Sequence, residues 1–482
     1  MHTPMKPDFV TEMLRGRGAE PLTAPSVETA AAREMPELAT PPTRDGLEDA
    51  ARQIAAAWRP VKGGAPLKAF QARIRQAADE VEKSLRTLRA SADAISDPLR
   101  WLTENHRIVR SALTDVREAS RRMAPEVPAV VAPSAPDVPV LRSYAAAEAT
   151  LRLSGWMFSE EALIDTIDAM QNGSTFDIGE LWALRPGLQM VLIERIAAAL
   201  RQATAEYALA DVPRVVQSLR AVSDADWKQL LDRLSIVDRV LRQDPAGAYG
   251  RMDFESRDAY RRAVCDLAAH STADELEVAL EVVRCASAAA KLERFNPRLS
   301  ERRSHVGYYL LDKGRGVIEQ TVRYEAPAGQ QLRAAMRRSP NLWYLGGVAL
   351  LTVAIVAFVL GGLGGSYPLF WAFVLLLIPA AESAIGVMNR LVAFLLPPQP
   401  LPRLDFSEGI PEDCRTLVAV PTLLGSEAQV RESVRDLEIR FLGNRDPHLH
   451  FALLTDPPDA QQRSDHRDDL AGLCASLVEE LN

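Results

Sequence analysis

The stretch SPNLWYLGGVALLTVAIVAFVLGGLGGSYPLFWAFVLLLIPAA, from Ser339 to Ala381, decides the architecture of this chain, because its 43 residues include no charged side chain. A helix rises about 1.5 Å per residue, so roughly 20 apolar residues cross a hydrocarbon layer about 30 Å thick. The stretch is therefore long enough to cross a membrane twice. Its middle, Gly361 to Pro368, supplies the glycine and proline residues at which a hairpin turns. We expect the two spans near residues 342–363 and 369–388.

The charges beside this stretch predict how the hairpin is oriented. Residues 291–340 hold eleven lysine or arginine residues and five acids, whereas the hairpin turn holds none. Because positively charged segments stay on the cytoplasmic side, both ends of the hairpin are expected in the cytoplasm. The sequence thus predicts a multi-pass membrane protein whose N-terminus and residues 391–482 are cytoplasmic. The alternative is a buried helical hairpin of a soluble protein, which the uninterrupted length of the apolar stretch disfavours.

Upstream of the hairpin the sequence is mainly helical. Residues 1–46 are rich in alanine, proline, threonine and glutamate, with little to bury, and predict a disordered leader. Apolar residues at helical spacing predict a helical segment at 47–122, and five prolines predict a semi-extended linker at 123–140. Helical spacing resumes at 141–338, where we expect an α-helical cytoplasmic domain. The hairpin itself is placed at 339–390.

The overall composition excludes several kinds of protein. Lysine and arginine number 56 and aspartate and glutamate number 64, which gives a formal net charge of −8, so a general affinity for nucleic acid is not indicated. The four cysteines include no Cys-x-x-Cys pair, so the sequence predicts neither a zinc site nor a disulfide framework. No apolar stretch follows the basic residues near the N-terminus, so a secretory signal peptide is not indicated.

After the hairpin the pattern changes from helical to mixed α/β. A connector at 391–412 contains PPQPLP, which favours an extended chain. The apolar run at 417–420 predicts a strand buried on both faces of a parallel sheet, and Pro421 is expected to end it. A capping box at Ser426 predicts the start of an amphipathic helix, and residues 448–456 predict a second strand.

The two strands and the helix between them make a βαβ unit within 413–482. A right-handed crossover places the loops after both strands at the same edge of the sheet, so Thr422 is expected beside Asp456. Ligands of α/β domains bind at this edge, and the Asp456 carboxylate can accept hydrogen bonds from a ribose or a uracil ring. The alternative, which spacing leaves open, is that Asp456 only shapes a turn with the prolines after it. His448 and His450 could share a strand face, but spacing supplies no third metal ligand.

Four stretches of the chain resemble one known family, the bacterial cyclic β-1,2-glucan synthases, which are very large inner-membrane glycosyltransferases. The second and the fourth stretch are long enough to be specific. The four stretches are FDIGELWAL (176–184), LSIVDRVLRQDPAGAYGRMDFESRDAYRRAV (234–264), HVGYYLLDKGRGVIE (305–319) and PPQPLPRLDFSEGIPEDCRTLVAVPTLL (397–424).

The resemblance implies a multidomain fold class. It comprises a mainly α-helical N-terminal region, a two-helix transmembrane hairpin and the start of an α/β, GT-A-like glycosyltransferase domain, of which 413–482 is the first and incomplete βαβ unit. The implied location is the bacterial inner membrane, and the implied activity is a glucosyltransferase that uses UDP-glucose to build β-1,2-glucan. On this resemblance Thr422 and Asp456 match nucleotide-side positions, and no catalytic residue is assigned.

The resemblance also implies a set of partners. They are UDP-glucose, the β-1,2-glucan chain, membrane lipid, and C-terminal glycosyltransferase and phosphorylase-like regions that are missing here. The family's divalent metal, Mg or Mn, would have its ligands beyond Asn482, and so would the catalytic base. We therefore expect this N-terminal part of a synthase to be inactive by itself. The alternative hypothesis is a non-catalytic, membrane-anchored helical scaffold or assembly module.

Overall fold

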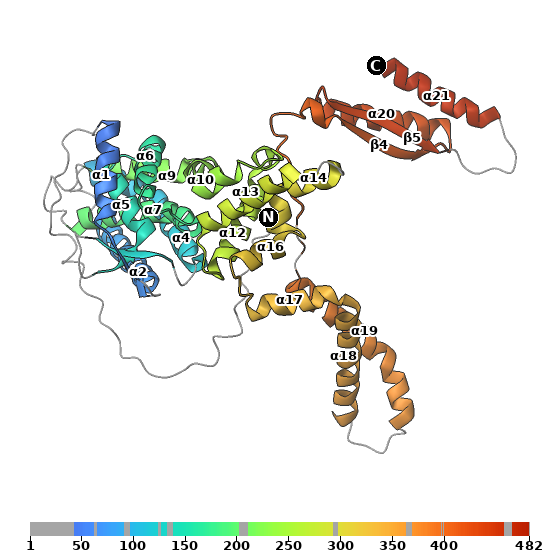
Figure 1. The fold of residues 1–482 in the computed structure, drawn as a ribbon, viewed down its shortest axis with the longest axis horizontal. Coiled ribbons are helices and arrows are strands. Elements are labelled where there is room, and N and C mark those ends of the chain that lie inside the picture. Colours follow the sequence, from blue (N-terminus) through green and yellow to red (C-terminus); the bar gives the residue numbers. More distant parts are fainter. Residues whose placement is uncertain are drawn as a thin grey trace. The chain divides into compact units, whose positions relative to one another are not determined.

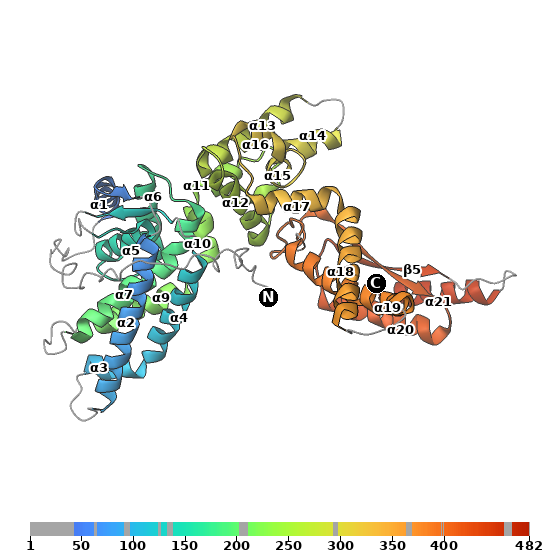
Figure 2. The ribbon, with the colours of Figure 1, turned by 90° about the horizontal axis from the view of Figure 1, so that it is seen from below.

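The chain folds into two compact units, which Figure 1 and Figure 2 show from two directions. One unit comprises the residues up to Pro245 together with Arg261–Glu325, and the other comprises Ala246–Tyr260 together with Ala326–Asn482. The first 42 residues, most of the predicted leader, lie outside the described part, and so does the hairpin turn at 363–368. The computed structural model describes residues 43–61, 65–90, 97–123, 127–132, 138–201, 211–292, 297–362, 369–396, 398, 400–456 and 465–481.

The part of the first unit that precedes α11 is built from helices around one long helix, α7 (Ile178–Arg201). Apolar side chains lie all round α7, so it is buried on several sides by neighbours that include α4, α5 and α9. A Cβ at Gly187 would lie 3.3 Å from the Ala147 Cβ of α5, so glycine lets these two helices pack closely. The other helices are α1 (Arg44–Ala56), α2 (Ala65–Ala90), α3 (Asp97–Glu104), α4 (His106–Arg122), α5 (Arg142–Leu153), α6 (Glu160–Gln171), α9 (Val212–Asp224), α10 (Trp227–Leu234), α11 (Ile236–Leu241), α13 (Glu275–Leu292), α14 (Pro297–Ser304), α15 (Val306–Leu311) and α16 (Arg315–Thr321), while α12 (Phe254–Ala269) spans the boundary between the units.

A small antiparallel sheet runs through the predicted linker. Strand β2 (Ala129–Val131) pairs with β1 (Arg59–Val61) on one side and with β3 (Val140–Leu141) on the other. Ala129 and Val130 are buried. The structure therefore differs from the predicted semi-extended linker, because the pairing partner β1 lies far earlier in the chain, where local composition does not reveal it. The predicted leader likewise extends too far, since α1 begins before its expected end.

Two long apolar helices, α18 (Pro340–Gly362) and α19 (Leu369–Leu395), form a hairpin in the second unit. In the described part of the chain, these are the helices long and apolar enough to cross a membrane, and most of their side chains are exposed. Tyr344 Oη donates a hydrogen bond of 2.8 Å to Asn389 Oδ1, which joins the two helices. The predicted spans coincide with these helices, except that α19 includes the first residues of the predicted connector because apolar residues continue to Leu395.

The second unit also contains a βαβ unit. Strands β4 (Thr416–Leu423) and β5 (Leu449–Asp456) are parallel neighbours, connected by α20 (Glu427–Gly443). Helix α21 (Asp465–Leu481) packs against α20, and a small apolar core lies between them. The buried core residues are Leu424, Val430, Val434, Leu470 and Cys474. The remaining elements of the unit are η4 (Tyr249–Arg251), α17 (Ala328–Arg338) and η5 (Glu412–Cys414).

Pro421 does not end the first strand, which continues two residues further. Thr416 N–H donates to the carbonyl of His448, and Leu424 N–H donates to the carbonyl of Asp456. Since backbone groups of alternate residues point the same way, the even-numbered N–H groups of β4 face β5. The nitrogen of Pro421 faces the opposite edge, where no described strand pairs, so proline removes no hydrogen bond from the ladder. The prediction that Pro421 ends the strand is wrong for this reason.

Candidate functional site

The carboxyl ends of β4 and β5 meet at one edge of the sheet. Their register places Thr422 opposite Thr455 and Leu423 opposite Asp456. Thr422 and Asp456 therefore lie on adjacent strands, one position apart in register, and strand alternation puts their side chains on opposite faces of the sheet. Their predicted proximity is confirmed, whereas a role in binding a nucleotide stays a prediction.

The N-terminus of α20 opens at the same edge. Ser426 Oγ accepts a hydrogen bond of 3.4 Å from Gln429 N–H, so the predicted cap of this helix is confirmed. Leu424 N–H donates to the Asp456 carbonyl at 3.0 Å and ties the start of the loop to β5. Helix N-termini expose unpaired N–H groups and a partial positive charge, which favour anions such as phosphates. The edge thus combines an anion-favouring helix end with a carboxylate on the next strand.

The side chains at this edge are open to solvent or nearly so. Asp456 is exposed, and among the described residues its carboxylate has no hydrogen-bond or ion-pair partner. Thr422 is half-buried, and its hydroxyl donates to the Val420 carbonyl at 3.5 Å. A carboxylate without a protein partner can accept hydrogen bonds from ligand hydroxyl or ring N–H groups. The turn that the sequence predicts after Asp456 falls at 457–464, outside the described residues.

The helices of this βαβ unit cover one face of its sheet. Val418 and Val420 are partly buried, whereas Leu417 and Leu423, on the other face of β4, are 64% and 61% exposed. Leu454 of β5 is 64% exposed on that same second face. Two parallel strands with helices on one face occur in many α/β folds. The narrower assignment to a GT-A fold is therefore a proposal. The prediction that residues 417–420 form a strand buried on both faces is wrong, because one face of β4 is exposed in the described part of the chain.

The connector after the hairpin is held against the segment before α12. Asp253 N–H donates to the Arg403 carbonyl at 3.1 Å, and Asp405 N–H donates to the Arg251 carbonyl at 2.8 Å. Arg403 N–H also donates to Ser256 Oγ at 2.8 Å, and the Arg403 guanidinium pairs with Asp253 at 3.0 Å. Sequence reasoning missed these contacts, although they join the second and the fourth of the stretches that carry the resemblance.

A cluster of buried and partly buried carboxylates lies at the start of α7, formed by Asp177 and Glu180 of the stretch FDIGELWAL and by Glu275 of α13. Glu180 N–H donates to Asp177 Oδ1 at 2.7 Å, and Asp177 N–H donates to Glu180 Oε2 at 3.0 Å, which makes a reciprocal capping box. Ile178 N–H donates to Glu275 Oε2 at 3.0 Å, and Arg142 pairs with Glu180. These carboxylates satisfy the first N–H groups of the central helix, which is a structural role.

Burial shifts the protonation of this cluster. It raises the pKa of Glu180 and of Glu275 to about 7, and it raises the pKa of Asp177 above its ordinary value. Within the described ranges, no group of three or more His, Cys, Asp or Glu side chains is arranged to hold a metal ion. The cluster is therefore not assigned to a metal.

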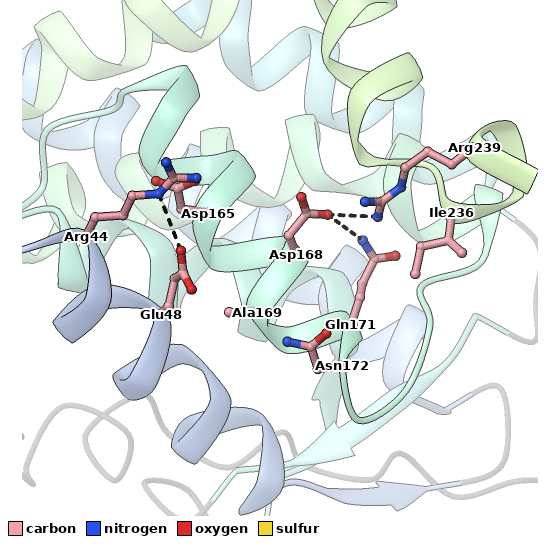
Figure 3. Close-up of a pocket in the computed structure, with 9 residues that line it drawn as sticks. All are labelled: Arg44, Glu48, Asp165, Asp168, Ala169, Gln171, Asn172, Ile236 and Arg239. Carbon is pink, nitrogen blue, oxygen red and sulfur yellow. Dashed lines mark hydrogen bonds and ion pairs between the residues drawn. The ribbon is translucent and has the colours of Figure 1, made fainter. Parts of the chain in front are cut away.

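A polar pocket of about 220 Å³ lies in the first unit between α1, α6 and α11 (Figure 3). Its charges are largely paired with one another: Arg44 with Asp165 at 2.8 Å, and Arg239 with Asp168 at 3.0 Å. The lining includes no aromatic ring on which a sugar or base could stack. Sequence reasoning did not predict this pocket, and we assign it no ligand. It is lined by Arg44, Glu48, Asp165, Asp168, Ala169, Gln171, Asn172, Ile236 and Arg239.

Comparison with known proteins bears on the resemblance. No protein-family model matches the chain. Over an alignment of 487 residues that takes in 81% of this chain, it is 27% identical to the cyclic beta-(1,2)-glucan synthase NdvB of Rhizobium meliloti (strain 1021). The chain is similar to a cyclic β-1,2-glucan synthase. The predicted resemblance to the cyclic β-1,2-glucan synthases is thus confirmed. The chain spans 17% of the length of that relative.

Proposed function

We propose that this chain is the N-terminal part of a membrane-bound cyclic β-1,2-glucan synthase, a glucosyltransferase that uses UDP-glucose to build β-1,2-glucan. The observation that supports it is the similarity to NdvB across most of the chain. The hairpin of α18 and α19 supports the membrane anchor. We place the protein in the bacterial inner membrane, with the βαβ unit in the cytoplasm, where nucleotide sugars are made.

The sheet edge formed by β4 and β5 is the proposed nucleotide site. Asp456 would accept hydrogen bonds from the ribose hydroxyls or the uracil N–H of UDP-glucose, and Thr422 would contact the same nucleotide from β4. The N-terminus of α20 would lie near its phosphates. In this proposal the βαβ unit belongs to a GT-A-like domain, and the growing β-1,2-glucan is the second substrate.

The divalent metal that the resemblance implies does not fit the described residues. Such an ion, Mg or Mn, is held by several carboxylate and other oxygen ligands. Asp456 is the carboxylate at the sheet edge, and in the described part of the chain no cluster of potential ligands forms. We derive no step through a metal and assign no catalytic base. We therefore propose that the chain by itself binds nucleotide without forming glucan, which an assay with radiolabelled UDP-glucose would test.

Binding of uridine diphosphate tests the proposed site. Isothermal titration calorimetry would use the full chain in lipid nanodiscs, with the variants Asp456→Asn and Asp436→Asn. We expect the native chain to bind, and Asp456→Asn to bind about tenfold more weakly because a charged acceptor is lost. Asp436 is exposed on α20 and has no described partner, so Asp436→Asn should bind like the native chain.

The outcomes separate the two hypotheses for this chain. Heat of binding that Asp456→Asn reduces supports the synthase site. A native chain that gives no heat contradicts nucleotide binding and supports the membrane-anchored helical scaffold, which the large helical share of the described residues also favours. Binding that neither variant changes would place the nucleotide elsewhere in the chain.

A further inference from the structure

Helix α17 meets the first apolar helix at a sharp corner. It ends at Arg338, and α18 begins at Pro340, so Ser339 alone separates them. Ser339 has φ −133° and ψ 61°, which is not helical, and the chain turns there. Both views draw α17 across the end of α18 and not as its continuation (Figure 1, Figure 2). If α18 crosses a bilayer, α17 lies along the membrane plane at the depth of the headgroups.

The side chains of α17 divide into two faces. At about 100° per residue, Leu332 and Ala335 share one face, while Arg333 and Arg337 lie on the opposite face. Leu332 is 45% exposed, and Ala335 is also exposed, so no described part of the chain covers the apolar face fully. Met336, at the flank of this face, is buried. An apolar stripe opposite arginine is the pattern of a helix that lies in a membrane interface.

The segment from Ala326 to Ala381, which includes α17, carries charge of one sign. No acidic residue occurs between Glu325 and Glu382 in the sequence. Among the described residues, no carboxylate lies within ion-pair distance of the three arginines of α17. Arg390 follows Asn389, whose hydrogen bond to Tyr344 places it at the same end of the hairpin. Four arginines thus gather at one end of the hairpin, namely Arg333, Arg337, Arg338 and Arg390.

We propose that α17 is an interfacial helix that binds the anionic lipid surface on the side of the membrane where the hairpin begins and ends. Leu332 and Ala335 face the acyl chains, and the arginines contact the headgroup phosphates. Charge complementarity and the direct junction with α18 identify the occupant as a bilayer with anionic lipid. The inference rests on α18 and α19 crossing the membrane, which belongs to the proposed function. It goes beyond that function because it assigns the binding of anionic lipid to α17.

Hydrogen exchange in nanodiscs tests this proposal. The full chain would be reconstituted in discs of phosphatidylcholine alone and in discs that also contain phosphatidylglycerol. We expect the amides of α17 to exchange about tenfold more slowly in the anionic discs, since each basic residue near such a surface strengthens binding. The variant Arg333→Gln/Arg337→Gln/Arg338→Gln should exchange at the same rate in both kinds of disc. Leu332→Ser should exchange faster than the native chain in the anionic discs.

The matched control changes the same amount of charge elsewhere. Arg431, Arg435 and Arg440 are exposed on α20, and the triple glutamine variant there should keep the lipid dependence of α17. Equal α17 protection in neutral and anionic discs would overturn the proposal and place α17 against protein. A lipid dependence that survives removal of the three α17 arginines would also overturn it. Failure of the chain to enter any disc would contradict the membrane hairpin instead, so the two failures are distinguishable.

Discussion

At the scale of single residues, the partly buried carboxylate Glu275 makes stability depend on pH. Burial raises the pKa of Glu275 to about 7 in the folded chain, above its ordinary value. Between about pH 4.5 and pH 7 the folded chain therefore keeps a proton on Glu275 that the unfolded chain has lost. The contribution of this group to the free energy of unfolding is fully present below about pH 4.5 and is lost as the pH rises through 7. We expect Glu275→Gln to raise the melting temperature at pH 8 relative to the native chain, with little difference at pH 5.

Circular dichroism melts of the detergent-solubilised chain at the two pH values check this prediction. The glutamine oxygen can still accept the Ile178 N–H, so the cap of α7 is retained. Glu118 is exposed on α4 and pairs with Arg122. The control variant Glu118→Gln should show the same pH dependence of the melting temperature as the native chain. If Glu275→Gln kept that same dependence, the neighbouring Asp177 and Glu180 and not Glu275 would be responsible for it.

At the scale of elements, the turn between α15 and α16 requires glycine at one position. A Cβ at Gly314 would lie 2.4 Å from Tyr308 Cδ1 and 2.9 Å from the Tyr308 carbonyl oxygen, so backbone would have to move. The same position donates its N–H to the Tyr308 carbonyl at 3.0 Å. We expect Gly314→Ala to destabilise the chain by about 1–3 kcal/mol, as overpacking does. Thermal or chemical denaturation measures this loss.

The neighbouring Gly316 provides the matched control for this turn. It lies in the same stretch, HVGYYLLDKGRGVIE, yet nothing lies within 4 Å of a Cβ built there. Gly316→Ala should be neutral or slightly stabilising, because alanine favours a helix over glycine by about 1 kcal/mol. Equal effects of the two substitutions would show that the close contact with Tyr308 is not what this turn depends on.

At the scale of the whole molecule, the proposed orientation of the membrane hairpin places residues 391–482, with the βαβ unit, in the cytoplasm. We expect Ser407→Cys, an exposed position in the connector, to react with an impermeant maleimide in inverted membrane vesicles and not in intact spheroplasts. The four natural cysteines would be replaced by serine beforehand. Ser366→Cys, in the predicted hairpin turn, should show the opposite labelling. The reverse result at Ser407 would place the proposed nucleotide site away from the cytoplasm and contradict the proposal that it binds UDP-glucose.

Part of the candidate site was predictable from local sequence. The capping box at Ser426 depends on residues three apart, and the proximity of Thr422 and Asp456 follows from the handedness of a βαβ unit. The contacts of the connector were not predictable in this way. Ser256 and Arg403 are separated by 147 positions, and their hydrogen bond depends on how the chain returns after the hairpin.

Local sequence is sufficient for the features that depend on neighbours along the chain: two long apolar helices, a mainly helical region before them and a βαβ unit after them. Spacing and length suffice for these, because a helix or a span is defined by residues within a few turns of one another. Three features become visible in the folded chain alone: the pairing of β2 with β1, the continuation of β4 through Pro421, and the desolvation that raises the pKa of Glu180 and Glu275. Each of these depends on which distant segment lies alongside. Pairing of backbone groups and exclusion of water are set by that neighbour and not by local pattern.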